Sequence, residues 1–210
     1  MHKHTFLYPL FLLIAGVAIG QNGLNKSLAA RIDSMTAEDQ HYRSILRDAR
    51  NQPERDEQAF RKSADDVRRI DSINLLKAKA IFAEFGYPGI DLIGSDGSHH
   101  FWLIAQHCDT DPGFQEKVLS AMYEQVAKKN ADAKDYAYLR DRVSVNQGQL
   151  QTYGTQMQIN ADSTSFEPKP LLEPEKIDER RREVGLGTME NYIMIMNNTY
   201  YGALKKKKDE

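Results

Sequence analysis

The sequence predicts a mostly α-helical protein, a single-domain helical bundle with a long irregular loop or short hairpin near residues 149–170. Apolar residues recur at intervals of three and four along most of the chain, which is the spacing of helices that bury one face. N-capping residues, prolines and glycines stand at the ends of these segments. Only the stretch at 149–170 lacks the helical spacing, so it is the part expected to be irregular.

Length and composition limit the class of protein. The 210 residues fit one domain, and the 28% charged and 40% hydrophobic content is typical of a folded chain. The 28 Lys and Arg against 30 Asp and Glu give a net charge of −2, which lacks the basic excess of a nucleic-acid-binding domain. A single cysteine excludes an intramolecular disulfide framework and a cysteine-rich zinc site.

Residues 1–20 have the pattern of a secretory signal peptide. Lys3 precedes an apolar run at 6–19, and small residues flank Ile19 before a cleavage point after Gly20. The run is shorter than the roughly 20 residues of a membrane-spanning helix, which favours cleavage over an uncleaved anchor. We therefore expect a mature domain of residues 21–210, exported to the periplasm or the extracellular space, with no transmembrane anchor.

Two long helices are expected in the first half of the chain. One covers residues 24–50, and the next starts near Asp56 and runs to Phe85, where Gly86 suits a left-handed C-terminal cap. Residues 89–97 are predicted to be a turn-rich connection. The predicted apolar stripe of the second helix is Val67, Ile70, Ile73, Leu76, Ala80 and Ile81.

The apolar run at 101–105 predicts an element buried on all sides, within a segment spanning 98–108. A buried strand gives the same run, but Asp111-Pro112 is typical of a restarting helix and favours the helical interpretation. Further helices are predicted at 112–129, 132–147, 174–185 and from Thr188 onward, which makes about six or seven in all. A basic tail at 205–208 is interpreted as a solvated chain end.

Several polar residues fall where the pattern predicts burial. Gln106 and His107 share the faces of the apolar run, and Asp141 and Arg142 flank the stripe of the 132–147 helix. A buried polar group without a partner costs about 1–3 kcal/mol, so each needs one. Asp109 and Asp141 are the expected carboxylate partners of His107. The group either fixes the fold or lines a pocket where His107 acts as an acid or base.

The segment Tyr153-Gly154-Thr155-Gln156 is predicted to fold back against an Asp141–Arg142 ion pair. Its hydroxyls, amide and backbone would supply partners to the buried groups, and Gly154 permits a close backbone approach. His107 is expected nearby. Any pocket should lie at this junction, with Gln106 and Gln115 in its lining.

No metal site or cofactor is predicted. His100 and His107 are seven residues apart, about 10 Å along a helix, which is too far for one ion. A metal site formed by His107, Asp109 and Asp141 stays open, although these residues have no diagnostic metal-binding spacing. The chain also lacks a phosphate-binding glycine loop and a serine-nucleophile elbow.

Short motifs give the chain a family resemblance. They are Asp39-Gln40 with Arg43, Asp71 with Asn74, Gly86-Tyr87-Pro88-Gly89, Gln106-His107-Cys108-Asp109, Phe114-Gln115, Tyr136-Ala137-Tyr138-Leu139, Asp141-Arg142 and Tyr153-Gly154-Thr155-Gln156. In this order the chain resembles a family of uncharacterised bacterial proteins, filed as a domain of unknown function. The resemblance implies a mostly helical fold and no established activity. It also implies that the Gln-His, Asp-Arg and Tyr-Gly-Thr-Gln segments form one unit.

Two classes of function remain open. The first is a binding or interaction module, whose partner is a small polar ligand or another envelope protein. The alternative is a cell-envelope hydrolase that uses His107 with Asp109 or Asp141 as its acid/base pair. Binding ranks first because the sequence supplies no nucleophile, metal set or cofactor motif, and whether the protein is an enzyme stays open. A catalytic role requires His107 to be hydrogen-bonded to a carboxylate and open to a cleft.

Overall fold

The computed structural model describes residues 23–208 except 53, 55 and 163, so the predicted signal peptide lies outside the described residues. The described chain is mostly helical, as predicted, and holds seven α-helices and one two-stranded hairpin. The helices are α1 (Lys26–Arg50), α2 (Glu57–Phe85), α3 (Ile90–Gln106), α4 (Pro112–Ala127), α5 (Ala133–Asn146), α6 (Ile177–Glu183) and α7 (Met189–Lys208). The strands are β1 (Met157–Ile159) and β2 (Phe166–Pro168), and a 3₁₀ turn η1 (Pro174–Lys176) precedes α6.

Capping residues set the ends of the helices as the sequence predicts. The side chains of Asp56, Asp111 and Asp132 each accept hydrogen bonds from the first turn of α2, α4 and α5. Gly86 ends α2 with φ of +67°, a conformation that favours glycine. The hairpin prediction is also confirmed, because β1 and β2 pair antiparallel within the otherwise irregular 149–170 stretch.

The predicted connection at 89–97 is wrong, because α3 already begins at Ile90. The backbone bends at Gly94, where φ is +79°, so two helical pieces meet at a kink. Asn130 holds the first piece: its side-chain oxygen accepts the Asp91 N–H at 2.8 Å. The buried run that follows is helical and not a strand, and Phe101 and Ile104 are completely enclosed.

The stripe predicted for α2 is also partly wrong. Ile73 and Leu76 are 37% and 70% exposed. The buried face instead continues from Ile70 through Asn74, an amide that occupies a core position. A search for apolar residues alone skips this position, which rotates the predicted face away from the real one. The buried positions of α2 are Ser63, Val67, Ile70, Asn74, Ala78 and Ile81.

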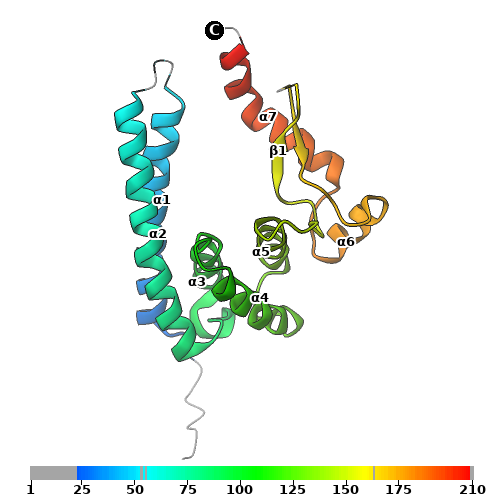
Figure 1. Ribbon diagram of the computed structural model, residues 1–210. Coiled ribbons are helices and arrows are strands. Elements are labelled where there is room, and N and C mark those ends of the chain that lie inside the picture. The colour runs from blue at the N-terminus through cyan, green and yellow to red at the C-terminus, as the bar shows by residue number, and fades with distance from the viewer. Residues whose placement is uncertain (1–22, 53, 55, 163, 209–210) are drawn as a thin grey trace, which may run out of the picture.

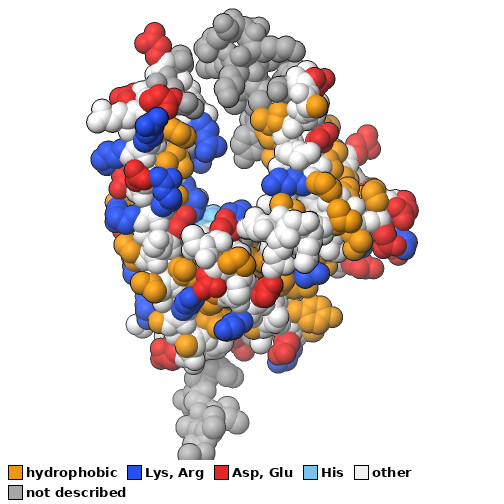
Figure 2. Space-filling view, viewed as in Figure 1, with side chains coloured by type: hydrophobic (Ala, Val, Ile, Leu, Met, Phe, Trp, Pro, Cys, Tyr) orange, Lys and Arg blue, Asp and Glu red, His pale blue; other side chains and the backbone are white. Residues whose placement is uncertain are grey.

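The elements form a base with two arms (Figure 1). Helices α3, α4 and α5 make the base, the α1–α2 hairpin (residues 26–85) makes one arm, and the strands with α7 make the other. The apolar core joins α1 and α2 to the base helices. Figure 2 shows a wide hollow between the arms, with His, acidic and basic side chains gathered on its floor. In the part of the chain that the structure describes, no helix has the length and hydropathy to cross a membrane.

Candidate functional site

A buried carboxylate lies on the core-facing side of α1. The buried positions Leu28, Ile32 and Met35 are followed, four residues on, by Asp39, whose exposed fraction is only 1%. A charge in such a position is tolerated only when it is paired and hydrogen-bonded. The surroundings of Asp39 therefore decide what this part of the molecule can do.

Three side chains contact the Asp39 carboxylate. His107 Nδ1 lies 3.1 Å from Oδ1, Arg43 Nε lies 3.1 Å from both oxygens, and Gln40 Nε2 donates to Oδ2 at 2.8 Å. Arg43 also donates through Nη2 to Asp71. Asp39, Arg43, Asp71 and His107 are called the Asp39 cluster below.

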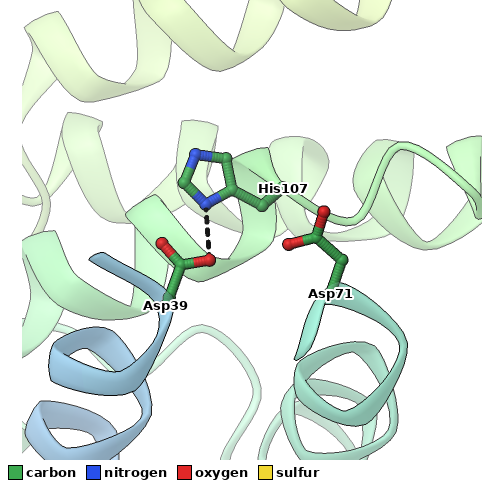
Figure 3. Close-up of side chains that lie close together, drawn as sticks. All are labelled: Asp39, Asp71 and His107. Atoms are coloured by element: carbon green, nitrogen blue, oxygen red, sulfur yellow. Dashed lines mark hydrogen bonds and ion pairs between the residues drawn. The ribbon is translucent and has the colours of Figure 1, made fainter. Parts of the chain in front are cut away.

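Three helices position the cluster, and Figure 3 shows Asp39 and Asp71 approaching His107 from different elements. Asp39 and Arg43 are one turn apart on α1, Asp71 projects from α2, and His107 is the C-cap of α3. One potential ligand atom from each of Asp39, Asp71 and His107 lies within 4.8 Å of the others. Packing of α1 against α2 and α3 therefore brings together residues far apart in the sequence.

The two carboxylates of the cluster respond oppositely to their surroundings. Burial alone raises the pKa of Asp39, but the His107 hydrogen bond, the charges of His107 and Arg43 and the Gln40 hydrogen bond together lower it below its usual value. Burial raises the pKa of Asp71, and Arg43 does not fully offset this. The cluster thus holds two carboxylates, one guanidinium and the imidazole of His107.

The cluster reaches solvent through three of its members. The side chains of His107, Asp71 and Arg43 are 14%, 22% and 26% exposed, whereas Asp39 is enclosed. In Figure 3 the second ring nitrogen of His107 points away from Asp39. Asp39 thus forms the buried end of the cluster, and His107, Asp71 and Arg43 form its partly exposed end.

Asn74 adds an unsatisfied amide one turn further along α2 from Asp71. Its side chain is buried, and among the described residues neither its nitrogen nor its oxygen has a hydrogen-bond partner. A buried amide without partners costs about 1–3 kcal/mol, so this position calls for a water or a ligand.

The predicted partnership of His107 with Asp109 or Asp141 is wrong in the structure, because Asp39 takes that place. Asp109 is bound instead by Arg142, with Nε 2.8 Å from Oδ1, and by Asn146 at 2.9 Å. Gln115 also donates to Asp109, and to the carbonyls of Ala105 and Gln106. Gln115 and Gln106 are buried and tie α4 to the end of α3.

The structure brings the 153–156 segment against Asp141, as predicted. Asp141 is fully buried and accepts backbone N–H groups from Thr152 at 2.7 Å, Tyr153 at 3.0 Å and Thr155 at 2.8 Å. The predicted Asp141–Arg142 ion pair is absent among the described residues, because Arg142 turns to Asp109. Asp141 is thereby a fastening point for the loop.

Other groups complete the loop. Arg181 of α6, which is 2% exposed, donates through Nη1 to the carbonyl of Tyr153 at 2.7 Å. Tyr192 of α7 donates to the carbonyl of Thr155 at 3.1 Å, and Gln156 donates to the hydroxyl of the same threonine. Tyr153 and Thr155 of the loop are thus held by side chains of α6 and α7.

A second group of polar residues lines a cavity of about 540 Å³ between α3 and the start of α5. His99 Nδ1 lies 2.8 Å from the Asp135 carboxylate. Burial raises the pKa of Asp135 to about 6, although the His99 hydrogen bond and charge oppose the shift. His100 pairs separately with Asp33, so the adjacent His99 and His100 have different carboxylate partners.

Sequence reasoning missed Asp39, Arg43 and Asp71 as partners of His107. Part of the signal was present, since Asp39 continues the apolar stripe of α1 and Arg43 follows it by one turn. Asp39, Arg43 and Asp71 also stood in the family motifs, without an assigned role.

Comparison with known proteins gives a family and no activity. A family of unknown function, DUF6624, matches residues 26–207, so the chain belongs to this family. No curated protein and no solved structure matches the chain.

Proposed function

We propose that this DUF6624 protein is a ligand-binding domain and that the Asp39 cluster holds its ligand. The observation that carries the proposal is the convergence of Asp39, Asp71 and His107 from three helices at a partly open surface. Because its two carboxylates outnumber its one guanidinium, the cluster favours a small ligand with positive charge or hydrogen-bond donors.

A purely structural role explains the cluster less well. Buried ion pairs contribute little to stability compared with apolar side chains of similar size. Here the Asp71 pair lies one turn from the Asn74 amide, which has no partner among the described residues. Asp141 shows another way in which this fold satisfies a buried carboxylate, with three fixed backbone donors and the charge of Arg181.

Thermal-shift measurements with small amines, amino sugars and divalent metal chlorides test the proposal. We expect at least one of these probes to raise the melting temperature of the wild type but not of Asp71→Asn. Asp65→Asn is the matched control, because Asp65 is also on α2 and bonded to an arginine but is 68% exposed. If no probe acts on the wild type, or if Asp71→Asn responds equally, the proposal is wrong.

Acid–base catalysis is the second candidate, with the carboxylate partner corrected to Asp39. An ionised Asp39 accepts the Nδ1 proton of His107 and leaves Nε2 to take a proton from water. The test is hydrolysis of p-nitrophenyl esters and phosphates by the wild type and by His107→Gln. Equal rates in the two proteins contradict this candidate.

We also propose that the domain acts outside the cytoplasm, in the periplasm or the extracellular space. The signal-peptide pattern at residues 1–20 supports this proposal. Mass spectrometry of the mature N-terminus is the test. A chain beginning at Gln21 supports export, and a chain that retains Met1 contradicts it.

A further inference from the structure

We infer that Asp39, Asp71 and His107 bind one divalent transition-metal ion of the zinc or manganese class. The inference rests on the proposed function and names its ligand. It starts from the geometry of three donor groups on three packed helices.

The donor atoms are close enough together to be drawn around one ion. Ligands bind zinc at about 2 Å in a tetrahedral arrangement, so two ligands of one ion are about 3.3 Å apart. The three donor atoms here lie within 4.8 Å of one another. To bind one ion, the three side chains would have to move closer together and exchange their bonds to Arg43 and to each other for bonds to the metal.

The donor types select the class of metal. Two carboxylates and one imidazole suit zinc, manganese or iron, whereas calcium and magnesium prefer oxygen ligands alone. Gln40 holds the Asp39 carboxylate in place through its hydrogen bond to Oδ2. Such a partner behind a ligand orients it and strengthens metal binding.

Asn74 supplies an independent observation. It lies three residues after Asp71 on the buried side of α2, and both of its amide atoms lack a partner among the described residues. A three-ligand ion completes its coordination with water. Because Asn74 is one turn from Asp71 on the same helix, we infer that a water on the ion is the partner of its amide, which has none among the described residues.

Arg43 would compete with the ion for the carboxylates of Asp39 and Asp71. Its guanidinium contacts both carboxylates and supplies the positive charge that the ion would bring. Because Arg43 is 26% exposed, its long side chain has room to turn toward solvent. Removal of this charge should therefore strengthen metal binding, whereas it would only weaken a cluster whose role is structural.

Isothermal titration calorimetry on protein dialysed against EDTA tests the inference, with zinc chloride and manganese chloride as probes. We expect one ion per chain, binding at least tenfold tighter in Arg43→Gln and at least tenfold weaker in Asp71→Asn. Asp65→Asn should bind as the wild type does. Calcium and magnesium chloride should bind more weakly than either probe.

A spectroscopic measurement covers the case in which Asp71→Asn fails to fold. Pulsed electron paramagnetic resonance of the manganese-loaded wild type should show coupling to a ring nitrogen of His107, and His107→Gln should lose it. The inference fails if neither probe binds the wild type or Arg43→Gln, if Asp71→Asn binds as tightly as the wild type, or if the nitrogen coupling is missing. A thermal response to amines in the absence of metal binding would leave the broader proposal standing.

Discussion

Two aspartates in this protein are almost equally buried and are satisfied in opposite ways. Asp141 accepts three backbone N–H groups of the loop that follows its helix. Asp39 is held by the side chains of Arg43, His107 and Gln40, which come from its own helix and from the end of α3. Their exposed fractions are 0% and 1%.

This difference in hydrogen-bond donors distinguishes a structural carboxylate from one that can bind a ligand. Backbone donors belong to the fold and cannot leave without unfolding the loop. Side-chain donors such as Arg43 can rotate away and be replaced by another positive group. Asp141 therefore has the environment of a structural carboxylate, and Asp39 has one that can exchange partners.

The largest expected effect belongs to Asp141→Ala. The change removes the acceptor of three buried N–H groups, and each unsatisfied donor costs about 1–3 kcal/mol. We expect the free energy of unfolding, measured by urea titration, to fall by about 3–5 kcal/mol.

Asp141→Asn is the control, because its remaining oxygen keeps part of the acceptor capacity and should restore about half of the loss. The loop should also become sensitive to protease near residues 152–156 in the alanine variant. An unchanged urea midpoint for Asp141→Ala would remove the distinction between the two aspartates.

Asp39→Asn should cost less, about 2 kcal/mol by urea titration. Arg43 keeps Asp71 as its partner in this variant, so no cation is left alone in the core. A double-mutant cycle with Arg43→Gln isolates the Asp39–Arg43 interaction. A loss larger than that of Asp141→Ala would show that the Asp39 cluster is the more important structural element.

The sequence was sufficient for the features that are local. The caps at Asp56, Asp111 and Asp132 and the break at Gly86 follow from residue type alone. Asp141 and its loop were also within reach, because only about a dozen residues separate donor and acceptor.

The carboxylate partner of His107 could not be predicted from local sequence. Asp39 is 68 residues away and meets His107 only because α1 packs along α3. Asp71 depends on the rotation of α2, which the sequence predicted wrongly because Asn74 stands in the buried stripe. A nearby carboxylate such as Asp109 therefore looked like the better partner, although Arg142 already occupies it.

Asp135 extends the comparison to a third buried carboxylate, one with a raised pKa. Its folded pKa of about 6 exceeds the ordinary value of 3.8, so the native state binds more protons between these values. The stability that Asp135 contributes is fully present below pH 3.8 and is lost as the pH rises through about 6. We expect a decline of at most about 2 kcal/mol across this window.

Urea titrations between pH 4 and pH 7 measure the decline, and Asp135→Asn should flatten it. Asp39 and Asp109 have lowered pKa values and act in the opposite sense, since their contributions are lost only as the pH falls below about 4. A wild-type profile as flat as that of Asp135→Asn would contradict the raised pKa.

The smallest expected effect belongs to Arg142→Gln, and it tests the pairing directly. Arg142 serves Asp109, whose side chain is 41% exposed, and Asn146 and Gln115 continue to bond that carboxylate when the arginine is removed. Exposed ion pairs contribute little, so the free energy of unfolding should fall by less than about 1 kcal/mol. If Arg142 instead neutralised Asp141, its loss would leave a buried charge unpaired and approach the cost of Asp141→Ala. Urea titration of Arg142→Gln beside Asp141→Ala therefore distinguishes a carboxylate held by its loop from one held by its neighbour.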